Sequence, residues 1–121
     1  MQLVQWMLAT NVVWDFISTY ILLDDGGVWW RQRVARMHTD WWSSEKDNTP
    51  QSRRVLALFL FTLGVMRALP LADTRLLPIA IASYCWEIFW LLAGAWCGVM
   101  SVKRVWPSAT LCTLCVFVCL M

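Results

Sequence analysis

Residues 76–98 have the sequence LLPIAIASYCWEIFWLLAGAWCG, and this stretch decides the fold class. Its 23 residues carry a single charge, Glu87, near the middle. As a helix it would be roughly 34 Å long, enough to cross a hydrocarbon core of about 30 Å. An ionised carboxylate at that depth costs on the order of 3 kcal/mol. The stretch therefore predicts a transmembrane helix whose acid needs a partner from another helix.

Small residues continue the face of this helix that carries Glu87. Ser83 lies four residues before the acid, and Gly94 and Gly98 follow it with a spacing of four between them. A pair of glycines at this spacing lets two helix backbones approach closely. We expect Ser83, Gly94 and Gly98, together with Asn11 of the first helix, to pack against other helices.

Three further apolar stretches, at about 3–23, 53–71 and 105–121, have the length and composition of helices. Hydrophobic residues make up 60% of the chain, whereas a soluble domain is about half apolar. We therefore predict an all-α polytopic membrane protein, a single domain of four transmembrane helices spanning residues 1–121. The first apolar stretch lacks a basic flank and a small-residue cleavage site, so we expect it to remain as a helix.

Residues 24–52 form the one long connection and combine tryptophans with arginines. Within it, 28–42 has an apolar face and a charged face at helical spacing, which favours an amphipathic helix lying in the membrane surface. A charged loop anchored by its tryptophans is the alternative. Bound phospholipid is expected in either case. The expected lipid-contacting residues are Trp29, Trp30, Arg33, Arg36, Trp41 and Trp42.

Basic residues are distributed unequally between the two ends of the predicted bundle. With four crossings, eight fall on the side of the long connection and two on the other. Cytosolic or matrix loops carry the excess of Lys and Arg, so both termini should face the opposite compartment. The eight are Arg31, Arg33, Arg36, Lys46, Arg53, Arg54, Lys103 and Arg104.

Three charged residues lie inside predicted helices. Counting residues from the helix ends places Asp15 and Glu87 at similar depth, with Arg67 about one helical turn away. An arginine side chain can cover that offset, so the three side chains are predicted to form one buried cluster. A structural ion pair, a proton or ion path, and a charge facing another subunit are the alternatives that we consider. Two acids against one arginine leave one negative charge unmatched.

Several other chemistries find no support in the sequence. A net charge of +2 gives no basis for nucleic-acid binding. Five cysteines are an odd number, and Cys112, Cys115 and Cys119 form a stripe in an apolar helix, which favours reduced thiols over a disulfide framework or a metal site. His38 is the one histidine and lies in the long connection. We expect no catalytic, cofactor or metal-ligating residues and no small-molecule substrate.

Three local patterns carry a family resemblance. WDFISTY at 14–20 is similar to a segment that has asparagine in place of the acid. SRR at 52–54 is followed by Arg67 thirteen residues after its last arginine, and Ser-Tyr at 83–84 with Glu87 is loosely alike. On these residues the chain resembles the small four-helix endoplasmic-reticulum scaffold family of ergosterol biosynthesis. The resemblance implies a non-catalytic scaffold that holds lipid-biosynthesis enzymes together.

Three functions remain open at this point. A structural accessory subunit of a large membrane complex is favoured, in the respiratory chain of the mitochondrial inner membrane, with other membrane subunits as partners. The alternatives are the endoplasmic-reticulum scaffold and a small transporter or proton-conducting protein. A water-lined cavity that reaches Glu87 would favour transport over the other two functions.

Overall fold

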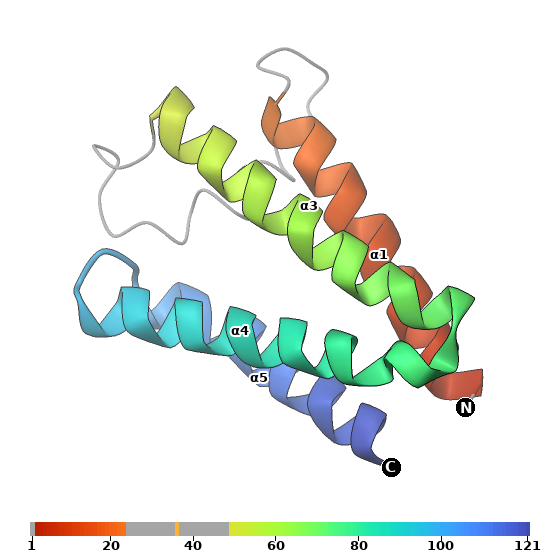
Figure 1. The fold of residues 1–121 in the computed structure, drawn as a ribbon. Helices are drawn as coiled ribbons and strands as arrows, with labels where there is room; N and C mark the ends of the chain where they lie inside the picture. The colour runs from red at the N-terminus through yellow and green to blue at the C-terminus, as the bar shows by residue number, and fades with distance from the viewer. Residues whose placement is uncertain (1, 24–35, 37–48) are drawn as a thin grey trace.

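The computed structural model describes residues 2–23, 36 and 49–121, and these contain helices but no strand (Figure 1). Within these described residues, four long helices and one short 3-10 helix follow one another. Four segments in the described part are long and apolar enough to cross a membrane, η2 and α4 together forming one of them. The elements are α1 (Gln2–Leu23), α3 (Pro50–Ala72), η2 (Thr74–Leu76), α4 (Leu77–Trp96) and α5 (Val102–Leu120).

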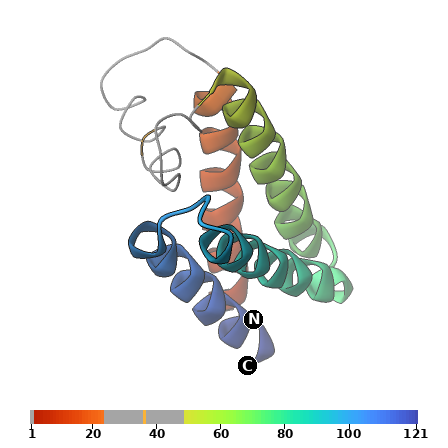
Figure 2. The same ribbon diagram turned by 90° about the vertical axis from the view of Figure 1, so that its left-hand side faces the viewer.

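The long helices are arranged as two antiparallel pairs (Figures 1 and 2). The helix α1 packs along α3, and α4 packs along α5. The two pairs are joined by the turn at η2 and by side chains that reach between α3 and α4. The start of α1 and the end of α5 lie at the η2 end of the bundle, whereas the end of α1, the start of α3 and the α4–α5 turn lie at the other end (Figure 1).

The start of α3 lies three residues before the predicted position, because a cap fixes it there. The Thr49 side chain accepts a hydrogen bond from the Ser52 backbone N–H, while the Ser52 hydroxyl accepts one from the Thr49 backbone N–H. This reciprocal arrangement satisfies two donors that a helix start leaves open. Pro50 then occupies the first turn, where a missing N–H costs nothing.

A local charge pair closes the turn between α3 and α4. Asp73 Oδ1 accepts hydrogen bonds from the Arg75 backbone N–H and from Arg75 Nε. These bonds hold the pKa of the exposed Asp73 carboxyl below its usual range. The turn between the two helix pairs is therefore defined by its own residues.

Gly94 and Gly98 do not share one helical face in the structure, contrary to the spacing in the sequence. The helix α4 ends at Trp96, and Gly98 lies in the following turn with φ +76°, exposed and with no atom within 4 Å of where a Cβ would point. At Gly94 the corresponding space is filled by Met100 of the same chain, whose Sδ lies 2.7 Å from the Cβ position. Both glycines therefore lie at or beside the α4–α5 turn, and their packing against a helix of another subunit stays a prediction.

Two apolar clusters lie at opposite ends of the bundle with polar residues between them. Along α1, Val4 and Leu8 belong to one cluster, Leu22 belongs to the other, and Asp15 lies between them. The α4 helix repeats the pattern, since Glu87 separates the buried residues of one cluster from those of the other. A polar layer thus crosses the middle of the apolar core.

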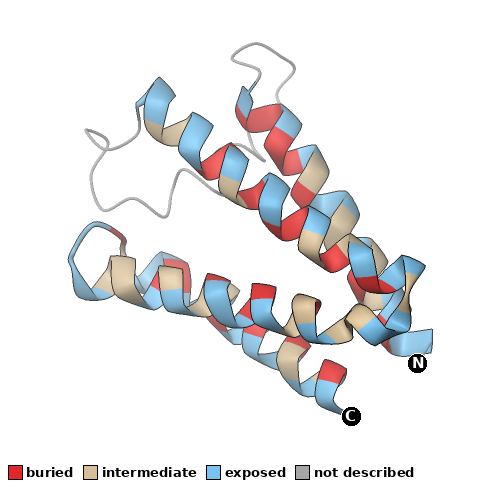
Figure 3. Ribbon diagram, in the orientation of Figure 1, coloured by how far each residue is buried: buried red, intermediate tan, exposed pale blue. Residues whose placement is uncertain are grey.

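The outer faces of all four long helices are exposed and apolar (Figure 3). Trp6, Leu58, Phe89 and Leu120 are examples, one from each helix, and each exposes more than half of its accessible surface. Exposed apolar patches of this extent are rare on soluble monomers and mark surfaces that contact lipid or protein.

The predicted surface helix at 28–42 lies outside the described residues, apart from Arg36, which is helical and exposed. Trp29, Trp30, Arg33, Trp41 and Trp42 are likewise outside them.

Candidate functional site

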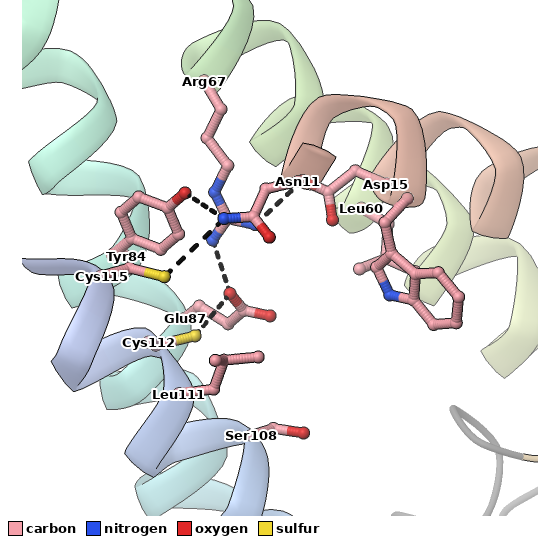
Figure 4. A pocket seen from close by; sticks show the side chains of 11 residues that line it. Asn11, Asp15, Leu60, Arg67, Tyr84, Glu87, Ser108, Leu111, Cys112 and Cys115 are labelled. Carbon is pink, nitrogen blue, oxygen red and sulfur yellow. Dashed lines mark hydrogen bonds and ion pairs between the residues drawn. The ribbon is translucent and has the colours of Figure 1, made fainter. Parts of the chain in front are cut away.

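Arg67 of α3 lies at the centre of the polar layer and binds groups from two other helices (Figure 4). Its Nη1 donates to Asp15 Oδ2 of α1 at 2.9 Å, and its Nη2 donates to Glu87 Oε2 of α4 at 2.5 Å. Asp15, Arg67 and Glu87 are 2%, 3% and 6% exposed. The structure therefore brings the three predicted charges together as a buried cluster.

The guanidinium is further held by neutral groups of α4. Arg67 Nε donates to Ser83 Oγ at 3.1 Å, and the Ser83 hydroxyl donates to the Ala80 carbonyl oxygen at 2.6 Å. The guanidinium carbon lies 4.0 Å from the centroid of the Tyr84 ring. A cation over an aromatic face is stabilised electrostatically, more so when both are desolvated. Three donor nitrogens and one face of the guanidinium thus have partners.

Asp15 reaches Arg67 because α1 and α3 approach closely beside it. Gly64 of α3 has no side chain, and a Cβ there would lie 3.2 Å from Asp15 Cβ and 2.9 Å from Phe16 Cε1. One turn further on, the Thr19 hydroxyl lies within hydrogen-bond distance of the Asp15 and Ala57 carbonyl oxygens, at 2.7 and 3.3 Å. Asp15 and Thr19 of α1 therefore both face α3.

The helix α5 contributes thiols to the cluster. The Cys112 thiol donates to Glu87 Oε2 at 2.9 Å, so this oxygen accepts from both Arg67 and Cys112. Asn11 Nδ2 of α1 donates to Tyr84 Oη at 2.5 Å and lies 3.7 Å from Cys115 Sγ. All four long helices therefore meet in this polar layer.

A cavity of about 210 Å³ lies directly beside these groups (Figure 4). Both carboxylates and the guanidinium line it, and its other walls are mostly apolar. All four helices contribute to the wall. The lining residues are Asn11, Trp14, Asp15, Leu60, Arg67, Tyr84, Glu87, Ser108, Leu111, Cys112 and Cys115.

Of the predicted packing positions, Ser83 and Asn11 belong to this polar layer, whereas Gly94 and Gly98 do not. Sequence reasoning missed Tyr84 and Gly64. Tyr84 follows Ser83 directly and lies on the Glu87 side of the helix, three residues before the acid, so its spacing carried a signal. Gly64 lies three residues before Arg67 in an otherwise bulky apolar helix, which is also a readable signal.

In the part of the chain that the structure describes, fold and site together define an all-helical protein with four helices able to cross a membrane and a buried charge cluster at their meeting point. Comparison with known proteins adds no family to this class: no family model, no curated protein and no solved structure matches the chain.

Proposed function

We propose that the chain is an integral membrane protein and acts as a non-catalytic structural subunit of a larger membrane complex. The four apolar helices and their exposed outer faces support membrane insertion. The observation that carries the structural role is the way in which Arg67 is held. Its nitrogens bond to Asp15, Ser83 and Glu87, so its bonding capacity serves to connect α1, α3 and α4.

The same cluster makes the stability of the chain in a bilayer depend on the contacts between its helices. Hydrocarbon offers no hydrogen-bond partner, so an intramembrane arginine or carboxylate must face the bundle interior and be paired. The ion pair between Arg67 and Glu87 joins the α1–α3 helix pair to the α4–α5 helix pair. The cluster therefore fixes the register of the two helix pairs. A scaffold needs such a fixed register, because its outer faces must keep their positions to bind other subunits.

Purification under native conditions tests the proposal. The chain, extracted in a mild detergent, is expected to co-migrate with other membrane proteins at fixed stoichiometry on a native gel. Identification of those proteins separates the respiratory-chain and sterol-scaffold alternatives. Migration of the chain alone, from a membrane in which it is abundant, would contradict a subunit role.

Transport of protons or small cations is a second candidate, and the cavity favours it. The cavity reaches both Asp15 and Glu87, and carboxylates that face a cavity at mid-membrane are typical of ion and proton pathways. Flux across vesicles that contain only this chain distinguishes the candidates, because a structural subunit gives none above the lipid background.

We further propose that the bundle end with the 24–48 connection faces the cytosol or matrix, with an interfacial helix at 28–42. The excess of basic residues at that end supports the orientation. Described members of this set are Arg36, Arg53, Arg54, Lys103 and Arg104.

A further inference from the structure

We propose that the cavity beside Asp15 and Glu87 is a binding site for a small organic ammonium ion. This inference depends on the cavity and its charges and does not require that the chain belong to a complex. It departs from the expectation that no small molecule is bound.

The charge balance of the polar layer leaves room for one more cation. With both acids ionised, the two carboxylates and the guanidinium carry a net charge of −1, and because a buried uncompensated charge is costly, either a proton on one acid or a bound cation must balance it. Arg67 uses Oδ2 of Asp15 and Oε2 of Glu87, so each acid retains a second oxygen. An ammonium group in the cavity that both acids line would bring the sum of charges to zero.

The remaining walls suit an organic cation better than a metal ion. Leu60 and Leu111 supply apolar surface, and Trp14 supplies the aromatic ring type that binds cations best. Hard metal cations require six or more oxygen ligands, which a largely apolar wall does not offer. Among the described residues, no group of three or more His, Cys, Asp or Glu is placed to hold a metal.

The cavity volume limits the size of the ligand. An engineered apolar cavity of about 150 Å³ accepts benzene, which has six non-hydrogen atoms. By proportion, a cavity of about 210 Å³ accepts roughly eight. Benzylammonium has that size and carries its charge at one end, and benzyl alcohol is a neutral molecule of nearly the same shape.

Access to the cavity lies between α1 and α5. Trp14 of α1 is 38% exposed and Leu111 of α5 is 59% exposed, and both line the cavity. These two helices pack against each other far less extensively than α1 packs against α3. An amphipathic cation can therefore enter from the side of the bundle with its charged end toward Asp15 and Glu87.

Calorimetric titration of the chain in lipid nanodiscs tests the site, with empty nanodiscs as the blank. Benzylammonium is expected to bind saturably at one site per chain, and benzyl alcohol is expected to show no saturable binding. Equal binding of the two would show an apolar pocket without charge recognition and would overturn the proposal. Loss of benzylammonium binding in sodium chloride, relative to N-methylglucamine chloride at the same ionic strength, would assign the site to a metal cation and also overturn it.

Two variants test separately whether binding depends on the charge of Glu87 and on the free volume of the cavity. Glu87→Gln keeps the hydrogen-bond acceptor and leaves one acid matched to Arg67, so binding should weaken by at least about tenfold while the fold persists. Ser108→Phe places a ring in the cavity and should also weaken binding, because Ser108 lines it. Thr110→Phe, an exposed position of α5 outside the cavity wall, is the matched control and should bind as the parent does. Unchanged affinity in both Glu87→Gln and Ser108→Phe would refute the site.

Discussion

Arg67 and Glu87 lie twenty residues apart on antiparallel helices and are joined by a 2.5 Å ion pair, 4% and 9% exposed at the side chains. This pair connects the α1–α3 half of the bundle to the α4–α5 half, while Asp15 secures Arg67 within the first half.

Arg67→Met should destabilise the chain by about 3–5 kcal/mol, because it leaves two buried carboxylates without a cation. Replacing Asp15 and Glu87 by Leu and Met in the same chain should recover most of that loss, since no charge then remains unpaired. Unfolding of the single and triple variants in mixed micelles measures both effects. A triple variant as unstable as the single variant would show that lost packing, not stranded charge, is responsible.

Glu87→Gln should change stability much less than Arg67→Met does. The amide oxygen can still accept from Arg67 and from the Cys112 thiol, and the cluster becomes neutral with Asp15 as the remaining acid. The expected loss is about 1 kcal/mol, the net value of one weakened hydrogen bond. The same unfolding assay measures it, and a loss as large as that of Arg67→Met would mean that Glu87 is the main partner of the arginine.

Gly64→Leu should separate α1 from α3. Even a Cβ at this position would lie 2.9 Å from the Phe16 ring, and overpacking of a tight interior typically costs about 1–3 kcal/mol. Val65→Leu changes the adjacent exposed position and serves as the control, with an effect within about 0.5 kcal/mol. Thermal unfolding of the two variants gives the comparison, and equal stability would place Gly64 outside the close contact.

Gly98→Ala should destabilise the α4–α5 turn by roughly 1–2 kcal/mol, because a side chain disfavours the left-handed backbone at φ +76°. A Cβ there meets no neighbouring atom, so the loss is conformational. Partner binding should be unaffected, because Gly98 lies in the turn beyond α4 and not on a helical face. Release of partner subunits by this substitution, at unchanged stability, would contradict that assignment.

Membrane orientation is predicted from the basic residues. A cysteine placed after Met121 in a chain whose own cysteines are replaced by serine or alanine should react with an impermeant reagent only from the side opposite the long connection. A cysteine at exposed Lys103 should react from the other side. Labelling of both positions from one side would contradict four crossings, and a reversed pattern would contradict the orientation.

Hydropathy was sufficient to predict the helices, and counting residues was sufficient to predict the charge cluster. Asp15, Arg67 and Glu87 stand out because charges are rare in apolar stretches, and helical rise converts sequence position into depth. The starts and ends of the helices were harder to predict from the sequence. The α3 start depends on the cap at Thr49, and the α4 end depends on a backbone conformation at Gly98 that a GxxxG pattern does not reveal.

The pairing of helices could not be obtained from the sequence. Gly94 and Gly64 are both small residues in apolar helices, yet only Gly64 lies where another helix approaches, while Gly94 faces Met100 in its own turn. The sequence also did not determine which face of α5 is buried. In the structure, the stripe of Cys112, Cys115 and Cys119 lies on the buried side. The cavity follows from how the four helices meet, which no single segment specifies.

The division of the charges between the two helix pairs has a consequence for biosynthesis. In the proposed bilayer arrangement, Asp15 and Arg67 both belong to the first hairpin, which can enter the membrane as a neutral pair as soon as α3 is made. Glu87 enters later, on a hairpin whose basic residues, Lys103 and Arg104, lie at the exposed start of α5, far along the chain from the acid. The second hairpin should therefore be retained at the insertion machinery until it docks on the first. Synthesis can be arrested after α5 and the nascent chain crosslinked to the insertion machinery. The Arg67→Met variant should stay in contact with that machinery longer than the parent chain does. Normal release of the variant would argue against docking-dependent insertion.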